Sequence, residues 1–235
     1  MQLTTNEIHI WSTNLTMTPA SEKDWLPLLS SDEHQRAMRF IFPIHQQRFI
    51  AARSILRQIL SLYLNIAPQA IIFAYTEYHK PYIRDYPEIR FNLAHSHEMA
   101  VYALTLHHAI GIDIEKIKPT YKSAVAKRYF SREENRELMQ LSNEERVLGF
   151  YQLWSKKEAI VKAVGKGLSI PLSSFSVSIR KEFEIIELEN ASWSLLSLPI
   201  HPDYSSALAS NQSVKSVLYW QFFDHGIQFD KTHHL

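Results

Sequence analysis

Two carboxylates that alternate along a predicted strand are the first side chains in this sequence able to do chemistry together. The run Gly111-Ile112-Asp113-Ile114-Glu115 has β-branched residues at every second position, which favours a strand. Side chains two apart on a strand share a face, with β-carbons roughly 7 Å apart. Asp113 and Glu115 therefore repel each other unless a cation or water lies between them, and such oxygen ligands suit Mg²⁺. The alternative is a solvated strand face neutralised by Lys116 and Lys118.

A glutamate and a lysine one helical turn apart form the second candidate group. Trp154, Glu158 and Lys162 recur every fourth residue and would share one face of a helix. Glu158 is then able to add a third carboxylate to a metal site while Lys162 meets a phosphate. The alternative is an ordinary surface ion pair, worth only about 0.3–0.5 kcal/mol. Gly165 and Gly167 either bring backbone amides close to a ligand or simply end the helix.

A polar run at the end of another predicted strand is the third candidate group. The segment 90–97 reads Arg-Phe-Asn-Leu-Ala-His-Ser-His and offers several hydrogen-bond donors to an anion. A turn stabilised by Asn92 and Ser96 is the simpler interpretation of the same residues.

Composition places these groups in an ordinary folded protein. The chain has 235 residues, 46% hydrophobic and 21% charged, which is enough for a packed core. The net charge of +1 gives no overall field that would select nucleic acid, so we expect none as a partner. The absence of cysteine excludes disulfides, thiol nucleophiles and cysteine-bound metals. The first residues lack the basic start and apolar run of a signal peptide, and the uncharged stretch 99–112 is too short to span a bilayer. We expect a cytoplasmic protein with no membrane contact.

Hydrophobic periodicity predicts the elements that must position these side chains. Long amphipathic helices are expected at residues 43–65 and 143–164, the second ending at Gly165 and Gly167. Shorter helices are expected at 24–29, 32–40, 121–130 and 132–141. The strands are predicted at residues 7–12, 70–76, 89–93, 99–105, 109–115, 175–180, 183–188, 193–198, 207–210 and 216–222.

Each half of the chain therefore has one long helix followed by several short strands. The segment 95–104 also resembles 201–209, since both begin with histidine and continue into small and apolar residues. We predict an α+β protein of two pseudo-symmetric α/β lobes, residues 1–108 and 109–235, each with a long helix packed on a small, mainly antiparallel sheet. A cleft between lobes is a common ligand site.

The order and spacing of all these motifs strongly resembles the Sfp-type 4′-phosphopantetheinyl transferases. The resemblance covers residues 30–178, and each motif alone is weak. It rests on an arginine-rich helix and four short motifs, which are Lys80-Pro81, Phe91-Asn92-x-x-His95-Ser96, Gly111-x-Asp113-x-Glu115 and Trp154-x-x-Lys157-Glu158-Ala159-x-x-Lys162-x-x-Gly165-x-Gly167.

The resemblance implies that coenzyme A binds between the lobes as a co-substrate and that the enzyme needs Mg²⁺, for which Mn²⁺ is a possible substitute. The implied metal ligands are Asp113, Glu115 and Glu158. The residues implied to bind coenzyme A are Arg36, Arg48, Lys80, Pro81, His95, Ser96, Asp113, Lys157 and Lys162. The implied catalytic residues are Glu134, Lys162 and Glu158, with Glu134 as the general base, although Glu133 beside it competes for that assignment.

Two departures from the family pattern concern coenzyme A. The family commonly has serine before the histidine, where this chain has Ala94, and basic residues ahead of Arg36, where this chain has Glu33 and His34. Neither departure touches the three carboxylates.

The implied activity is that of a monomeric holo-[carrier protein] synthase, which moves the 4′-phosphopantetheine of coenzyme A onto a serine of an acyl or peptidyl carrier protein and releases 3′,5′-ADP. The carrier is expected to have an acidic helix beside its serine. The basic segment 116–128 follows the predicted metal strand and would attract such a partner, unless it is only a solvated rim. The resemblance leaves open whether the carrier serves fatty acid, polyketide, nonribosomal peptide or siderophore synthesis. A metal-dependent phosphodiesterase and a non-catalytic coenzyme A-binding or carrier-binding protein are the alternatives.

Overall fold

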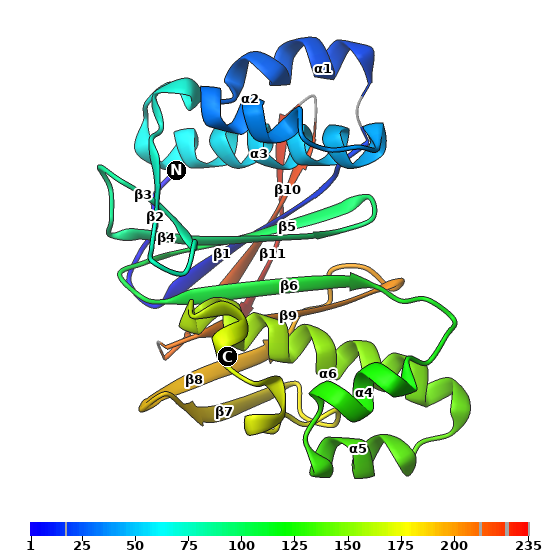
Figure 1. Ribbon diagram of the computed structural model, residues 1–235. Helices are drawn as coiled ribbons and strands as arrows, with labels where there is room; N and C mark the ends of the chain where they lie inside the picture. The colour runs from blue at the N-terminus through cyan, green and yellow to red at the C-terminus, as the bar shows by residue number, and fades with distance from the viewer. Residues whose placement is uncertain (17, 212, 224–225, 235) are drawn as a thin grey trace.

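The computed structural model describes residues 1–16, 18–211, 213–223 and 226–234. Helices and sheets form two lobes, one above the other in Figure 1, which confirms the predicted α+β class. The first part of the chain contains β1 (Glu7–Asn14), α1 (Pro19–Trp25), α2 (Ser31–Ala37), α3 (Pro43–Leu64), β2 (Phe73–Tyr75), β3 (Pro81–Ile83), β4 (Ile89–Ser96) and β5 (Met99–Leu106). The second part contains β6 (Ile110–Lys116), α4 (Ser123–Tyr129), α5 (Arg132–Met139), α6 (Asn143–Val164), β7 (Phe183–Leu188), β8 (Ala191–Ser197), β9 (Tyr204–Ser210), β10 (Ser216–Phe223) and β11 (Gly226–His234).

The two larger sheets lie between two layers of helices, and β2 and β3 form a separate two-stranded sheet. One sheet has the strand order β11-β10-β1-β5-β4 and is covered by α3, and the other has the order β6-β9-β8-β7 and is covered by α6 (Figure 1). A third apolar core fills the space between the sheets and includes Ile10, Val101, Ile112 and Leu208. Both faces of the central strands β5 and β9 are thus buried, which explains the apolar run of β5 and the small and apolar residues of β9.

Local signals explain where the two long helices begin and end. Helix α3 has a proline in its first turn and ends at Asn65, which has a left-handed backbone (φ 54°). Helix α6 begins with a capping box between Ser142 and Glu145 and ends at Gly165, whose φ of 81° favours glycine. Both helices were predicted within one residue of these bounds. Among the described helices, none is long and apolar enough to cross a membrane.

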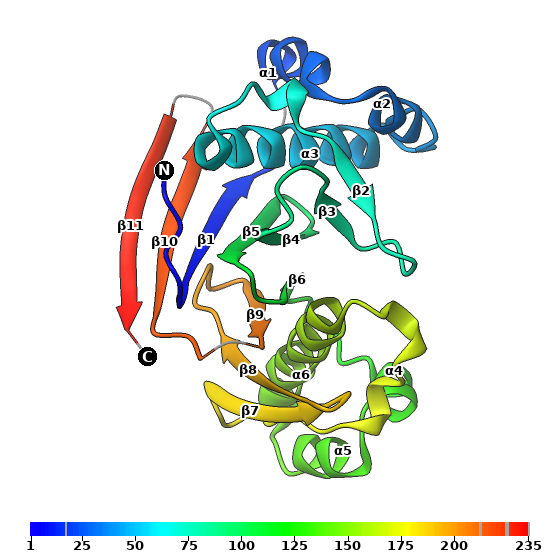
Figure 2. The same cartoon turned by 90° about the vertical axis from the view of Figure 1, so that its left-hand side faces the viewer.

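The end of the chain returns to the first lobe, which corrects the predicted boundary between the lobes. Strand β10 pairs in parallel with β1, from Glu7 opposite Ser216 to Ser12 opposite Gln221, and β11 pairs with the outer edge of β10. Figure 2 shows β10 and β11 beside β1 at the left edge. Only the part up to β9 builds the second lobe, so the assignment of 109–235 to one lobe was wrong for these last two strands.

The predicted strand at residues 175–180 is not formed. Carboxylates hold this segment in place of a neighbouring strand: the Val177 amide donates to Glu134 (2.8 Å) and the Ser178 amide donates to Glu184 (3.0 Å). Its backbone donors are therefore satisfied without a sheet.

Candidate active site

Close packing of β6 on α6 creates the site. A β-carbon added to Gly111 would lie 2.2 Å from the carbonyl oxygen of Ala159 and 2.3 Å from the nitrogen of Ala163. Only glycine therefore allows this strand and helix to approach so closely. As a result, Glu158 and Lys162 of α6 lie beside the acidic side chains of β6.

Asp113 and Lys162 form the central ion pair of the site. The Lys162 Nζ lies 2.5 Å from Asp113 Oδ1, and the Asp113 side chain is only 6% exposed. Burial raises the pKa of Asp113 above its usual value, although the Lys162 charge acts in the opposite direction. Among the residues that the structure describes, the buried Asp113 Oδ2 has no hydrogen-bond partner. Because a buried carboxylate oxygen without a partner is costly, this atom is suited to a cation.

Glu115 is oriented by a hydroxyl from the other lobe. The Ser96 hydroxyl donates to Glu115 Oε2 (3.0 Å) and accepts from the Lys116 amide (3.1 Å). Four residues earlier on β4, the side-chain oxygen of Asn92 accepts from the Ile112 amide (2.8 Å). Burial and the charge of Asp113 raise the pKa of Glu115. Asn92 and Ser96 thus join β4 to β6 and fix the strand that carries both carboxylates.

Glu158 lines a cavity between the lobes of about 270 Å³. The cavity takes residues from the β2–β3 hairpin, from β4 and from the end of α6. They are Tyr78, His79, Lys80, Pro81, Asn92, Glu158, Val161, Lys162, Gly165 and Gly167. Burial raises the pKa of Glu158, and the charge of Asp113 raises it further. The three predicted acidic residues are therefore close enough for their charges to interact, although they come from distant parts of the chain.

Lys80 lies at the rim of this cavity, but its ammonium group is already engaged. It donates to the carbonyl oxygens of Ile110 (2.9 Å), Lys162 (2.6 Å) and Ala163 (3.1 Å). Burial lowers the pKa of Lys80 to about 8, and the Arg90 charge contributes to the shift. Lys80 therefore caps the end of α6 and attaches it to the first lobe.

The three carboxylates do not form a ready-made metal site. Across the described residues, no three His, Cys, Asp or Glu side chains are grouped so that they could hold a metal ion. The donor set nevertheless fits a divalent cation: it has three carboxylates with raised pKa values, and one buried oxygen of Asp113 has no partner. Lys162 provides the positive charge beside Asp113 in this structure.

The predicted basic residues are divided between two places. His95 lies within reach of the charges of Lys162 and Arg48, which add to the effect of burial and lower its pKa. Arg48 also approaches Glu98 at 3.9 Å. Arg36, in contrast, lies over the ring of Phe49 and lines a separate hollow with Arg39 and Phe40. The structure does not bring Arg36 to the cavity of Lys162.

Glu134 and Lys157 are buried away from the cavity, which corrects two sequence assignments. Both side chains are at most 1% exposed, and the Lys157 Nζ lies 2.8 Å from Glu134 Oε1. Lys157 also donates to the carbonyl oxygens of Leu172 and Phe175, at 2.6 and 2.7 Å. Glu134 accepts from the amides of Ser131 and Val177. With every partner internal, Glu134 is not placed to act as a general base, nor Lys157 to contact coenzyme A.

Glu33 likewise has an internal role. Its carboxylate, 2% exposed, accepts from Arg53 and Arg57 and closes the capping box of α2 with Ser30. The Arg57 guanidinium also donates hydrogen bonds to the carbonyl oxygens of Pro68 and Ile71. The acidic residue that departs from the family pattern therefore anchors α2 on α3 and does not oppose an anionic ligand. The Ser-x-x-Glu pattern at residues 30–33 is the signal that could have shown this.

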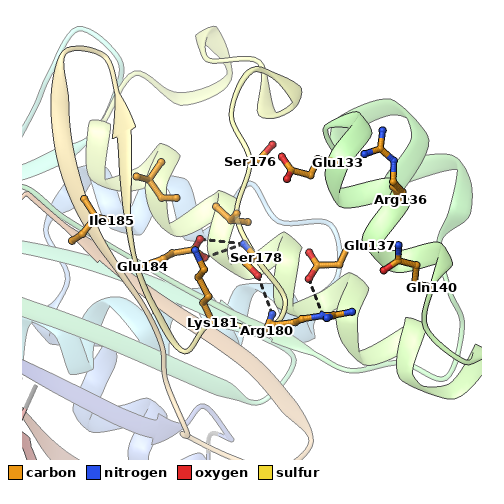
Figure 3. A pocket seen from close by; sticks show the side chains of 12 residues that line it. Glu133, Arg136, Glu137, Gln140, Ser176, Ser178, Arg180, Lys181, Glu184 and Ile185 are labelled. Atoms are coloured by element: carbon orange, nitrogen blue, oxygen red, sulfur yellow. Dashed lines mark hydrogen bonds and ion pairs between the residues drawn. The ribbon is translucent and has the colours of Figure 1, made fainter.

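Another hollow, of about 580 Å³, lies between α5 and the segment before β7 (Figure 3). Its charged side chains have both signs, and Arg180 approaches Glu137 at 3.5 Å. Apart from Glu133, the neighbour of Glu134, it contains none of the residues considered for the reaction. Its charges are balanced, so it offers no net attraction to an anion.

Comparisons with known proteins place the chain in a family. The family model described as the 4′-phosphopantetheinyl transferase superfamily matches residues 109–213, and the model of the N-terminal domain of 4′-phosphopantetheinyl transferases matches residues 18–107. The chain is 37% identical to 4′-phosphopantetheinyl transferase HetI of Nostoc sp., over 84% of this chain and 85% of that protein. It is 34% identical to 4′-phosphopantetheinyl transferase Sfp of Bacillus subtilis, over 74% of this chain and 78% of that protein. A crystal structure of holo-[acyl-carrier-protein] synthase from Thermotoga maritima matches with a TM-score of 0.32 and 17% identity, over 50% of this chain and 70% of that one.

The family models and the relatives define the class of protein as a transferase, and the structure builds it from two α/β lobes. The chain belongs to the 4′-phosphopantetheinyl transferase family. The predictions of family and of transferase class are thereby confirmed.

Proposed function

We propose that this protein transfers 4′-phosphopantetheine from coenzyme A to a serine of an acyl or peptidyl carrier protein. The observation that carries the proposal is the coupled group of Asp113, Glu115, Glu158 and Lys162 beside the inter-lobe cavity, in a chain that belongs to the transferase family. Carboxylates and a lysine of this kind suit a pyrophosphate with its counter-ion, and the neighbouring cavity suits the nucleotide.

The reaction is a phosphoryl transfer. The serine oxygen forms a bond to the β-phosphorus of coenzyme A, and the bond from that phosphorus to the bridging pyrophosphate oxygen breaks. The electron pair leaves with 3′,5′-ADP, and the serine proton is released. Such transfers depend chiefly on positioning and on stabilising charge.

The residues of this chain would each contribute to that positioning. Asp113, Glu115 and Glu158 would hold Mg²⁺, or Mn²⁺ in its place, which when bound draws charge from the pyrophosphate oxygens. The Lys162 ammonium would meet a phosphate at the cavity, and His95 with Arg48 would supply further positive charge near it. Pro81 and the stem of Lys80 would flank the adenine. Ser96 would keep Glu115 turned toward the site.

One chain supplies both walls of this cavity, so we infer that the enzyme acts as a monomer. We place the reaction in the cytoplasm, in keeping with a chain that has no cysteine.

Mass spectrometry of an apo-carrier incubated with this protein, Mg²⁺ and coenzyme A tests the proposal. We expect the carrier to gain one phosphopantetheine group and 3′,5′-ADP to appear in equal amount. Cleavage of coenzyme A without any modified carrier would instead indicate a phosphodiesterase. Binding of coenzyme A with neither product would indicate a non-catalytic binding protein.

A further inference from the structure

The connection between α2 and α3 exposes an unusual run of apolar side chains. Met38 is 75% exposed, Ile41 is 88% exposed and Phe42 is 62% exposed, and Phe40 and Ile44 are also exposed. Five large apolar residues within seven consecutive positions form one patch, here called the apolar lip (residues 38–44). Single exposed apolar residues are ordinary, but a continuous patch of this kind marks an interaction surface.

Positive charge outweighs negative charge around the apolar lip, where Asp32 lines the same hollow as Arg36 and Arg39 and Glu98 approaches Arg48. Arg36 and Arg39 are exposed beside it, and His45 and Arg48 follow within the first turns of α3. The chain has no aspartate or glutamate from residue 34 to residue 76. A partner for this surface therefore has to present apolar side chains together with acidic ones.

The apolar lip lies at the end of the site away from Lys80. Figure 1 shows the α2–α3 connection, the β4–β5 turn and the loop after β6 at the same end of the molecule, whereas the β2–β3 hairpin lies at the other end. Arg48 approaches Glu98 in that turn at 3.9 Å. The cavity lined by Lys80 and Pro81 lies toward the opposite end, so a nucleotide bound there would leave the side of the lip for the acceptor.

A basic segment of the second lobe faces the same turn. Burial and then the charges of Lys118 and Arg48 lower the pKa of His97, so both lobes place cations around this one residue. Lys118 and Lys122 are exposed, and residues 116–132 contain no acidic residue. The apolar lip and this basic segment therefore lie at the same end of the molecule, close to the β4–β5 turn and to the end of the strand that carries Glu115.

We propose that the apolar lip, residues 38–44, is the first-lobe half of the docking surface for the carrier protein. The inference rests on the proposed function, since it assumes that an acidic carrier brings its serine to this site. The carrier would lay apolar side chains on Ile41 and Phe42 while its acidic groups face Arg39 and the lysines of residues 116–122. A second copy of this chain is a poorer occupant, because two copies would oppose cation to cation.

Binding of an apo-acyl carrier protein whose acceptor serine is replaced by alanine tests the surface without requiring any transfer. We expect Ile41→Glu to weaken carrier binding at least tenfold, because it removes an apolar contact and repels acidic groups. Ile41→Lys should weaken binding less than Ile41→Glu, and the difference should shrink as salt is added. The matched control is Ile185→Glu on β7, which is also more than half exposed and should leave binding unchanged. Because both positions are exposed, neither variant should alter folding.

Transfer kinetics separate this inference from the proposed function. With wild-type carrier, Ile41→Glu should raise the KM for carrier at least tenfold and leave the KM for coenzyme A unchanged. Unchanged carrier binding in Ile41→Glu would overturn the docking surface even if the wild-type protein transfers phosphopantetheine. A wild-type protein that binds the carrier at the lip but transfers nothing would overturn the proposed function alone. A wild-type dimer that Ile41→Glu converts to a monomer, with carrier binding unchanged, would make the lip a self-association surface and refute the proposal.

Discussion

The buried pair of Glu134 and Lys157 offers a direct test of structure against sequence resemblance. The resemblance assigns Glu134 as a general base, whereas the structure encloses it and gives it three internal partners. In Glu134→Gln, the side-chain NH₂ group would face one of the donors that now meet the carboxylate. Lys157 would lose its counter-charge while fully buried. If the structure is right, this variant is a stability variant.

The expected cost follows from the burial of both groups. Removing one partner of a buried ion pair typically costs about 3–5 kcal/mol, because the other charge is left uncompensated. For a chain of this size, each kcal/mol lowers the Tm by roughly 2–4 °C. The Tm of Glu134→Gln should therefore fall by roughly 6–20 °C, and the segment that Lys157 and Glu134 hold, residues 172–177, should exchange its amide hydrogens faster.

Calorimetry and carrier modification measured well below the lowered Tm distinguish the two roles. We expect near-normal transfer per folded molecule at low temperature, together with the large fall in Tm. Glu133→Gln is the matched control for stability, because Glu133 is exposed one residue earlier and its replacement should leave the Tm unchanged. A Glu134→Gln protein with an unchanged Tm and a transfer rate reduced a hundredfold would refute the structural role and restore the general base.

Three further predictions concern other parts of the molecule. Asp113→Ala should abolish transfer, measured by carrier modification, and leave the Tm equal or higher, because burial of this carboxylate is unfavourable; retained activity would remove Asp113 from the site. Burial lowers the pKa of His9 to about 4 in the folded protein, although the charge of Glu7 acts in the opposite direction. As the pH falls, His9 therefore takes up a proton at a higher pH in the unfolded chain than in the folded one. Stability should thus decrease from about pH 6.5 down to about pH 4, by denaturant titration, and His9→Asn should flatten that decrease. Glu33→Gln should destabilise the fold by about 3–5 kcal/mol in the same titration and leave coenzyme A affinity unchanged in calorimetric binding; weaker binding in a stable variant would contradict its internal role.

The elements of the site were predictable because their signals are local. Alternation of isoleucines gave the strand that carries Asp113 and Glu115, and the i, i+4 spacing placed Glu158 and Lys162 on one helix face. The glycine at 165 gave the end of that helix. Each of these inferences depends on neighbours within a few residues.

The inferences that failed depend on tertiary contacts. The pairing of β1 with β10 joins residues more than two hundred positions apart, and no local pattern in a short apolar strand selects that partner. The segment 175–180 has strand-forming residues, but side-chain carboxylates satisfy its amides. Tertiary hydrogen bonds thus overrode its propensity.

Charged residues caused the remaining errors, because a sequence does not show which charges are buried. Glu134 and Lys157 lie in segments where a solvated or catalytic role is the usual expectation. One local signal argued otherwise: Ser131 and Glu134 have the spacing of a capping box, which commits the glutamate to the backbone of its own helix. The same spacing recurs at Ser30 and Glu33. Glu33 is also a buried carboxylate, and it stands where the resemblance implies a basic residue for coenzyme A.

The two lobes contribute different kinds of side chain to the site. Asp113 and Lys162 both belong to the second lobe, so their ion pair does not depend on the first lobe. The first lobe instead contributes polar side chains that bond to the backbone of the second lobe. Asn92 and Ser96 accept hydrogen bonds from backbone amides of β6, and Lys80 donates hydrogen bonds to carbonyl oxygens at the start of β6 and the end of α6. These bonds fix where the Asp113–Lys162 pair lies relative to the cavity wall. Loss of the Lys80 ammonium should therefore weaken coenzyme A binding, whereas the ion pair between Asp113 and Lys162 should persist.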